Sequence, residues 1–152
     1  MRRPVHHPTR SDPIRPERPP MTIVVGYIPR PEGLAAVETA IAEAELRGSR
    51  LVVVNTGHHG DYTDPSFAAP QDLDALEAQL TARGIEHEIR QPTRGLAPAD
   101  ELLATADEVG ATLLVIGLRR RNPLGKLITG STAQQVLLDA GCAVLAVKAP
   151  PV

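Results

Sequence analysis

Five aliphatic runs, separated by segments with the spacing of amphipathic helices, constrain the fold of this chain more than any other feature. The runs lie at residues 23–27, 51–54, 85–90, 113–116 and 143–147. The run at 85–90 alternates apolar and polar residues, as an exposed edge strand does, whereas the others are aliphatic almost throughout. Strands of that composition belong to a parallel sheet that is covered on both faces.

Between the runs, apolar residues recur at helical spacing over 31–48, 73–84, 98–110 and 131–140. The sequence therefore predicts an α/β fold in which strands and helices alternate. Apolar residues make up 42% of the 152 residues, which is enough for the core of one domain. Since crossovers between parallel strands are right-handed, we expect a doubly wound five-stranded sheet of order 3-2-1-4-5, with helices on both faces.

Residues 1–20 form a separate segment that has few core-forming residues. They contain five arginines against Asp12 and Glu17, and six of the 15 prolines. This composition is typical of disorder, and the segment lacks the apolar run of a signal peptide. We expect a Pro/Arg-rich disordered extension over 1–20 and one folded domain over 21–152. Either the extension is a flexible arm of the protein, or Met21 is the physiological start.

The composition argues against several classes of partner. A formal net charge of −2 offers no overall attraction to nucleic acids or membrane surfaces. Aromatic residues, at 2%, are too few to stack single-stranded bases. No stretch approaches the length of a membrane span, and one cysteine, Cys142, allows no intrachain disulfide. We expect a cytoplasmic protein without a nucleic-acid or membrane partner.

In open α/β sheets, ligands bind beyond the carboxyl ends of the strands, where the strand order reverses. For the predicted order, this place lies between the first and fourth strands, which are followed by the loops 27–30 and 118–129. The second loop leads to Gly130, Ser131 and Thr132 at the start of the last helix, where free N–H groups and the helix dipole favour an anion. We predict that these three residues bind phosphate; the alternative is ordinary helix capping by Ser131.

Three consecutive arginines, Arg119, Arg120 and Arg121, lie in the same loop. Their guanidinium groups suit charge-assisted hydrogen bonds to phosphate, although a solvated basic loop has the same composition. A Walker A site is excluded, because Leu127 follows Gly125-Lys126 where that motif requires Ser or Thr.

The sequence contains no recognisable catalytic or metal-binding constellation. His58-His59, with Asp61 and Asp64, matches no set of metal ligands of known spacing. There is no nucleophile elbow, and the carboxylate nearest the predicted site, Glu32, is expected in the first turn of the first helix. We therefore expect neither an enzyme nor a metal protein. His87 is expected to be exposed, and Cys142 to be a small buried thiol.

From Met21 to Lys148 the chain resembles the universal stress protein family. The family's nucleotide-binding branch has the loop pattern G-x2-G-x9-G-[S/T], which Gly117 and Gly130-Ser131 match at the same spacing. The resemblance implies that ATP, with Mg²⁺, binds at this loop and that adenine lies near Val53 and Val54. It also implies a homodimer that pairs through the last strand, CAVLAVK, and a role as a stress-response sensor or regulator.

Two departures from the family pattern concern the nucleotide. Arg120 stands at the second glycine of the pattern, and Ile28 stands where an aspartate would hold a ribose hydroxyl. An isoleucine accepts no hydrogen bond, and Pro29 removes a backbone donor. Two alternatives to ATP binding therefore remain open. One is a degenerate dimeric interaction module, and the other is a binder of anions or phosphometabolites that uses Arg30 and the loop arginines.

Overall fold

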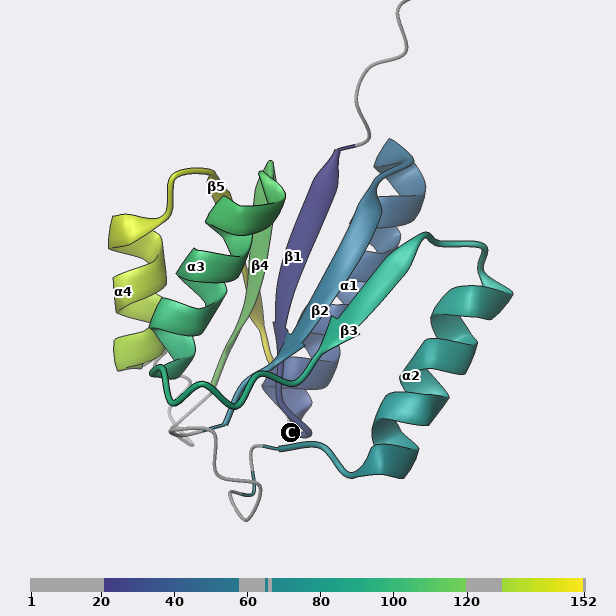
Figure 1. Cartoon of the computed structure of the whole chain (residues 1–152), viewed down its shortest axis with the longest axis horizontal. Helices are drawn as coiled ribbons and strands as arrows, with labels where there is room; N and C mark the ends of the chain where they lie inside the picture. The colour runs from purple at the N-terminus through teal and green to yellow at the C-terminus, as the bar shows by residue number, and fades with distance from the viewer. Residues whose placement is uncertain (1–20, 58–64, 66, 120–129, 152) are drawn as a thin grey trace, which may run out of the picture.

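The computed structural model describes residues 21–57, 65, 67–119 and 130–151. These residues form strands and helices in strict alternation (Figure 1). The elements are β1 (Thr22–Tyr27), α1 (Pro31–Arg47), β2 (Arg50–Asn55), α2 (Pro70–Ala82), β3 (His87–Arg90), α3 (Pro98–Val109), β4 (Leu113–Leu118), α4 (Ser131–Asp139) and β5 (Ala143–Lys148).

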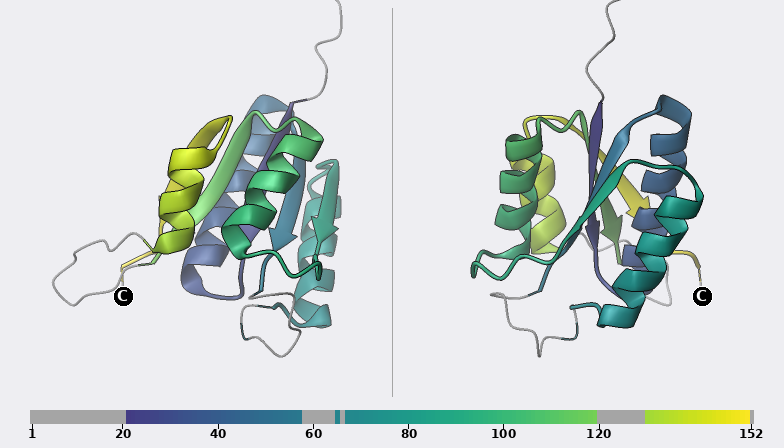
Figure 2. Two further views of the ribbon diagram at one scale, coloured as in Figure 1. Left: turned by 60° about the vertical axis from the view of Figure 1, so that its left-hand side comes forward. Right: turned by 45° about the vertical axis from the view of Figure 1, so that its right-hand side comes forward.

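The strands form one sheet of order β3-β2-β1-β4-β5, and every neighbouring pair is parallel. This order confirms the predicted doubly wound topology. Helices α1 and α2 cover one face of the sheet, and α3 and α4 cover the other, so that three layers are visible when the sheet is seen on edge (Figure 2). In this topology the carboxyl ends of β1 and β4 lie side by side at the reversal of the strand order.

The aliphatic runs are buried because both faces of the sheet are covered. On β1, Ile23 and Val25 pack with α1 and α2, while Val24 packs with α3 and α4, and all three side chains are fully buried. The other central strands, β2 and β4, divide their residues in the same way. The alternation of side chains along a strand thus produces two cores from one continuous aliphatic run.

Two element boundaries differ from the sequence prediction. Helix α2 begins at Pro70 rather than Leu73, because a proline at N1 fixes the helical φ and needs no N–H partner. Strand β3 begins at His87 rather than Ile85. The N–H of Ile85 donates instead to the carbonyl of Leu80 at the end of α2, 3.1 Å away.

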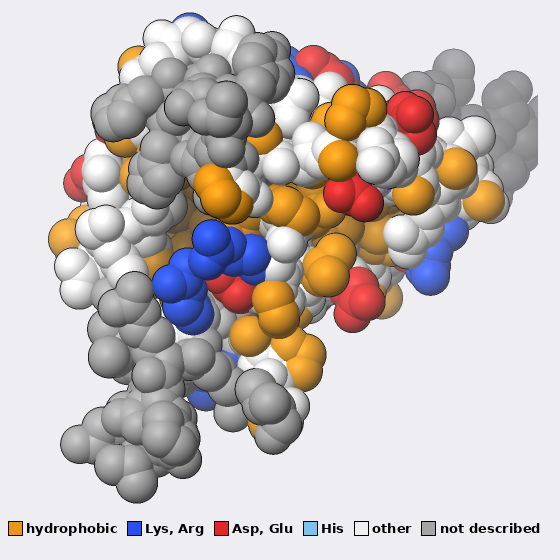
Figure 3. All heavy atoms as spheres, turned by 90° about the horizontal axis from the view of Figure 1, so that it is seen from below, with side chains coloured by type: hydrophobic (Ala, Val, Ile, Leu, Met, Phe, Trp, Pro, Cys, Tyr) orange, Lys and Arg blue, Asp and Glu red, His pale blue; other side chains and the backbone are white. Residues whose placement is uncertain are grey.

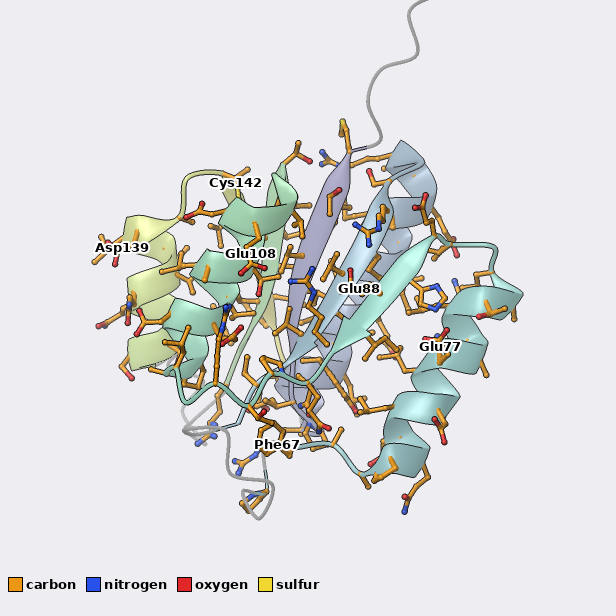
Figure 4. The ribbon with its side chains drawn as sticks, viewed as in Figure 1. Phe67, Glu77, Glu88, Glu108, Asp139 and Cys142 are labelled. Atoms are coloured by element: carbon orange, nitrogen blue, oxygen red, sulfur yellow. The ribbon has the colours of Figure 1, made fainter. Side chains whose placement is uncertain are left out.

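On the face of α3, an alternating chain of ion pairs crosses from the sheet to the helix. Figure 4 labels Glu88 on β3 and Glu108 on α3, and Arg90 contacts both of them. The pairs are Arg50–Glu88, Arg90–Glu88, Arg90–Glu108, Arg94–Glu108 and Arg94–Glu101. Hydrogen bonding from Arg90 outweighs the effect of burial and holds the pKa of Glu88 below its ordinary value. We call this set the ion-pair chain.

None of the helices in the described part of the chain is long and apolar enough to cross a membrane. Residues 1–20, for which we predict an extension, lie outside the described residues.

Candidate functional site

The site predicted from the sequence lies where β1 and β4 end, next to the first turns of α1 and α4. We call this region the switch-point site. Figure 3 looks onto this end of the molecule and shows a group of basic side chains around an acidic one, beside apolar side chains. The described residues of the site come from the β1–α1 connection, the end of β4 and the start of α4.

Gly117, on β4, is required by packing. A Cβ atom at this position would overlap the backbone carbonyl of Glu32 in the first turn of α1. Gly33, the residue after Glu32, is also required by packing, because its Cβ would overlap the backbone of Ile28. These two glycines let the first turn of α1 lie directly against the β1–α1 connection and the end of β4. Gly117 therefore has a structural reason to be glycine that does not involve a ligand.

Gly130, the N-cap of α4, has no such reason within the described residues. Its φ of −68° is accessible to any residue, and a Cβ there would meet no described atom within 4 Å. The packing of the described residues therefore does not explain why this position is a glycine. Close approach of a ligand to the backbone is one physical reason for a glycine that neither φ nor packing requires.

Ser131 and Thr132 follow as the first residues of α4. Ser131 is exposed and Thr132 is half-buried. The capping alternative for Ser131 is wrong, because the N-cap residue is Gly130 and the helix has no side-chain cap. The hydroxyl groups of Ser131 and Thr132 thus lie at a helix start whose N–H groups have no side-chain capping acceptor among the described residues.

The first turn of α1 places a buried carboxylate in the site. Glu32 is only 8% exposed, and its Oε1 lies 3.5 Å from Nε of Arg119 at the end of β4. From the sequence we expected Glu32 in this turn, but neither its burial nor its arginine partner. Its burial follows from Gly117 and Gly33, which draw the turn against the strands.

The β1–α1 connection lacks the acceptor that the family pattern supplies. Ile28, Pro29 and Arg30 are all half-buried. The N–H of Arg30 donates to the carbonyl of Ile28 at 2.8 Å, and the carbonyl of Arg30 accepts from Leu34 as α1 begins. The only polar groups of Ile28 are its backbone groups, so its side chain makes no polar contact with a sugar.

Asn55, at the end of β2, makes a set of buried hydrogen bonds that we did not predict from the sequence. Asn55 is fully buried, and its Nδ2 donates to the carbonyl of Tyr27 at 2.9 Å. Its Oδ1 accepts from the N–H of Ala68 and from Nε2 of Gln91, each at 2.9 Å. Asn55 thus ties the ends of β1, β2 and β3 to the segment that enters α2. A polar residue ending an aliphatic run is the signal that could have identified it.

Val53 and Val54 lie inside the sheet and have fully buried side chains. Val54 pairs with Gly26 on one side and with Arg90 on the other. A ligand at the carboxyl end of the sheet would therefore lie nearer to Thr56 and Gly57, which follow the strand. Phe67 lies at this end of the molecule (Figure 4) and covers Gly57, whose Cβ would be 2.6 Å from its ring.

The prediction that His87 is exposed is wrong. Its side chain is 10% exposed and lies between α2 and β3, where Nε2 contacts Oε1 of Glu77 at 2.8 Å. Its Nδ1 lies 2.7 Å from the carbonyl of Ile85. Burial lowers the pKa of His87, but the bonds to Ile85 and Glu77 and the charge of Glu77 together raise it above its ordinary value.

A shallow pocket of about 150 Å³ lies at the opposite end of the strands, between the ends of α3 and α4. It is lined by Cys142 and Asp139, both labelled in Figure 4. Cys142 is half-buried rather than buried, and burial together with Asp107 raises the pKa of its thiol. A protonated thiol is a poor nucleophile and metal ligand. Because it lies at the amino ends of β4 and β5, the pocket is not part of the switch-point site.

Several predicted residues lie outside the described part of the chain. These are Arg120 and Arg121 in the loop at 120–129, and His58, His59, Asp61 and Asp64 in the segment 58–64. Among the described residues, no group of three or more His, Cys, Asp or Glu side chains is placed to hold a metal ion.

Comparison with known proteins gives consistent matches. The model of the universal stress protein family matches residues 20–148. A universal stress protein of Mycolicibacterium smegmatis is 48% identical over 126 residues, which cover 83% of this chain and 96% of that protein.

Two solved structures of similar proteins contain adenine nucleotides. A universal stress protein in complex with cAMP is 27% identical, with a TM-score of 0.62 over 86% of this chain and 98% of that one. The universal stress protein of Archaeoglobus fulgidus in complex with dAMP is also 27% identical, with a TM-score of 0.54 over 84% of this chain and 98% of that one.

Proposed function

Because the chain belongs to the universal stress protein family, we propose that it binds an adenine nucleotide at the switch-point site and uses it as a regulatory ligand. The observation that carries this proposal is the start of α4. Gly130 is a glycine that neither φ nor the described packing requires, and it opens a helix without a side-chain cap. Such a helix start favours an anion.

The chemistry of the neighbouring residues supports a phosphate-bearing ligand. Arg119 lies at the end of β4 with its side chain 44% exposed, and the hydroxyls of Ser131 and Thr132 lie at the start of α4. Guanidinium groups, hydroxyls and helix N-termini are common partners of phosphate. The two related proteins solved with cAMP and dAMP support adenine as the base.

The glycine pattern implies ATP with Mg²⁺ as the ligand. ATP stays a prediction, since the two related proteins are solved with the monophosphates cAMP and dAMP. We further propose a cytoplasmic homodimer that pairs through β5. Among the described residues, β5 pairs with β4 alone, and its four central residues are half-buried. An edge strand with this exposure is suited to pairing with a second copy. We propose no catalytic role.

Titration calorimetry of the full chain tests the proposal. AMP, cAMP, ATP with Mg²⁺ and pyrophosphate serve as ligands, with GMP as the control for the base. We expect micromolar binding of an adenine nucleotide that Gly130→Val abolishes, because a side chain then occupies the approach to the backbone. Since that Cβ meets no described atom, the variant should fold normally. No heat and no thermal stabilisation at millimolar nucleotide would contradict the proposal.

The second candidate is a dimeric interaction module without a nucleotide. Ile28 favours it, because the β1–α1 connection presents no side-chain acceptor to a sugar. The same titration separates the two candidates, since a module of this kind dimerises but gives no nucleotide signal. Light scattering on the same samples tests the dimer independently.

A further inference from the structure

Glu32 places a buried carboxylate at the same end of the sheet as the proposed phosphate-binding residues. Its side chain is 11% exposed, and its carboxylate faces Arg119, which follows the end of β4. A fixed negative charge in this place opposes the approach of a phosphate. Within the described residues, Arg119 is its one ion-pair partner.

The ion pair between Glu32 and Arg119 is long. Nε of Arg119 lies 3.5 Å from Oε1 of Glu32, whereas charge-assisted N–H···O bonds are about 2.7–2.9 Å long. A guanidinium group has five N–H donors, so the one long contact that Arg119 makes within the described residues uses little of this capacity. Arg119 is also 44% exposed, which leaves it accessible to a second acceptor.

The backbone prevents Glu32 from moving away from the site. A Cβ on Gly117 would overlap the carbonyl of Glu32, so this turn of α1 is already in close contact with β4. Gly33 fixes the next residue against Ile28 in the same way. The backbone that carries Glu32 is therefore held in place, and the carboxylate stays within reach of Arg119, which follows the end of β4 and has a long side chain.

We propose that Glu32 competes with the phosphate of a bound nucleotide for Arg119, and so makes the site prefer adenine nucleotides of low charge to the triphosphate. This proposal rests on the proposed function. A monophosphate can share Arg119 with Glu32, since the total negative charge around one guanidinium stays small. A triphosphate brings additional charge towards the same buried carboxylate, and repulsion between like charges increases accordingly.

Calorimetric titration of the full chain with adenosine, AMP and ATP with Mg²⁺ tests this inference, with wild type compared with Glu32→Gln. The glutamine keeps the shape of the side chain and removes its charge. We expect AMP affinity to rise about fivefold, which corresponds to roughly 1 kcal/mol, because Arg119 is partly screened by solvent. ATP affinity should rise by more than AMP affinity, and adenosine affinity should not change.

A double-mutant cycle identifies the partner. In an Arg119→Gln background, Glu32→Gln should raise the nucleotide affinity little or not at all, because the guanidinium group for which Glu32 and phosphate compete is absent. The matched control is Glu101→Gln, another buried glutamate paired with an arginine but located in the ion-pair chain. This control should leave all three affinities unchanged.

Three outcomes would overturn the inference. These are a loss of AMP or ATP affinity in Glu32→Gln, an equal gain for adenosine, or a gain that persists without Arg119. Should Glu32→Gln fail to fold, wild type alone remains decisive. At low salt AMP should bind more tightly than ATP, and the gap should narrow at high salt; tighter binding of ATP at low salt contradicts the inference.

Failure of the proposed function has a different signature. In that case neither adenosine nor any nucleotide gives heat in any variant. If AMP binds, and its affinity is the same for wild type and for Glu32→Gln, the proposed function holds and the competition between Glu32 and phosphate is contradicted.

Discussion

Two buried glutamates, each in the first turn of a helix and each facing an arginine, show how differently one arrangement can be completed. Glu101 in α3 receives three hydrogen bonds of 2.7–3.1 Å from Arg94, on both of its oxygens. Glu32 in α1 has one contact of 3.5 Å with Arg119. The exposures are similar, at 6% and 11% for the glutamates and 47% and 44% for the arginines.

The difference shows which arginine has hydrogen-bond donors available for a ligand. Arg94 also contacts Glu108, so the donors of Arg94 are used by two glutamates of the ion-pair chain. These contacts hold the loop before α3 against that helix. The Glu32 pair has one long contact within the described residues, and it lies at the same end of the sheet as the start of α4, whose N-cap residue supplies no side-chain acceptor. Two predictions test this contrast, and a third tests the histidine on β3.

The largest effect should come from the glycine that holds Glu32 in place. Gly117→Ala should cost about 3 kcal/mol or more, at the upper end for overpacking, because its Cβ overlaps the carbonyl of Glu32. Gly130→Ala should change stability by less than about 1 kcal/mol, since its φ suits any residue. Urea denaturation of both variants measures the difference. Equal losses would mean that the turn of α1 is not fixed by β4.

A smaller effect should separate the two glutamates. Glu101→Gln should lower the midpoint of thermal unfolding by several degrees, because it removes the negative charge and one of the two oxygens that accept hydrogen bonds from Arg94. Glu32→Gln should lower the midpoint by much less, since its single contact is long. Scanning calorimetry in low and high salt measures both. If Glu32→Gln costs as much as Glu101→Gln, the pair with Arg119 is structural and the contrast fails.

The smallest effect should come from His87, which joins β3 to α2. Because its pKa is raised in the folded protein, its contribution is complete below the ordinary value of 6.5 and is lost as pH rises through the folded pKa. Glu77 is 56% exposed, so we expect less than about 1 kcal/mol. Urea denaturation between pH 5.5 and about 8 measures this loss. His87→Gln should reduce the change in the free energy of unfolding with pH. If this change is the same in the variant as in wild type, another titrating group causes it.

Much of the fold could be predicted from the sequence. Continuous aliphatic runs specify buried parallel strands, and the helical spacing between them specifies the crossovers, so the order β3-β2-β1-β4-β5 was confirmed. The location of the switch-point site follows from that order. The boundaries of α2 and β3 differ from the prediction by two or three residues. The fixed φ of Pro70 starts α2 early, and the N–H of Ile85 bonds to the end of α2 rather than to the sheet.

The side-chain partners could not be predicted in the same way. His87 was expected on an exposed edge, but α2 folds over it and supplies Glu77. The hydrogen bonds of Asn55 join residues 28 and 36 positions apart in the chain. No spacing rule applies to such contacts, because they depend on how closely the layers approach one another.

The sequence by itself determined the order of the elements, the two cores and the helix start at Gly130, because periodicity and glycine placement act locally along the chain. Only the tertiary structure decided that Glu32 is buried and that Arg119 is its partner. The physical reason is the close approach of α1 to β4, which the missing side chain of Gly117 permits. A contact of this kind depends on two segments separated by 85 residues and is established when the layers pack.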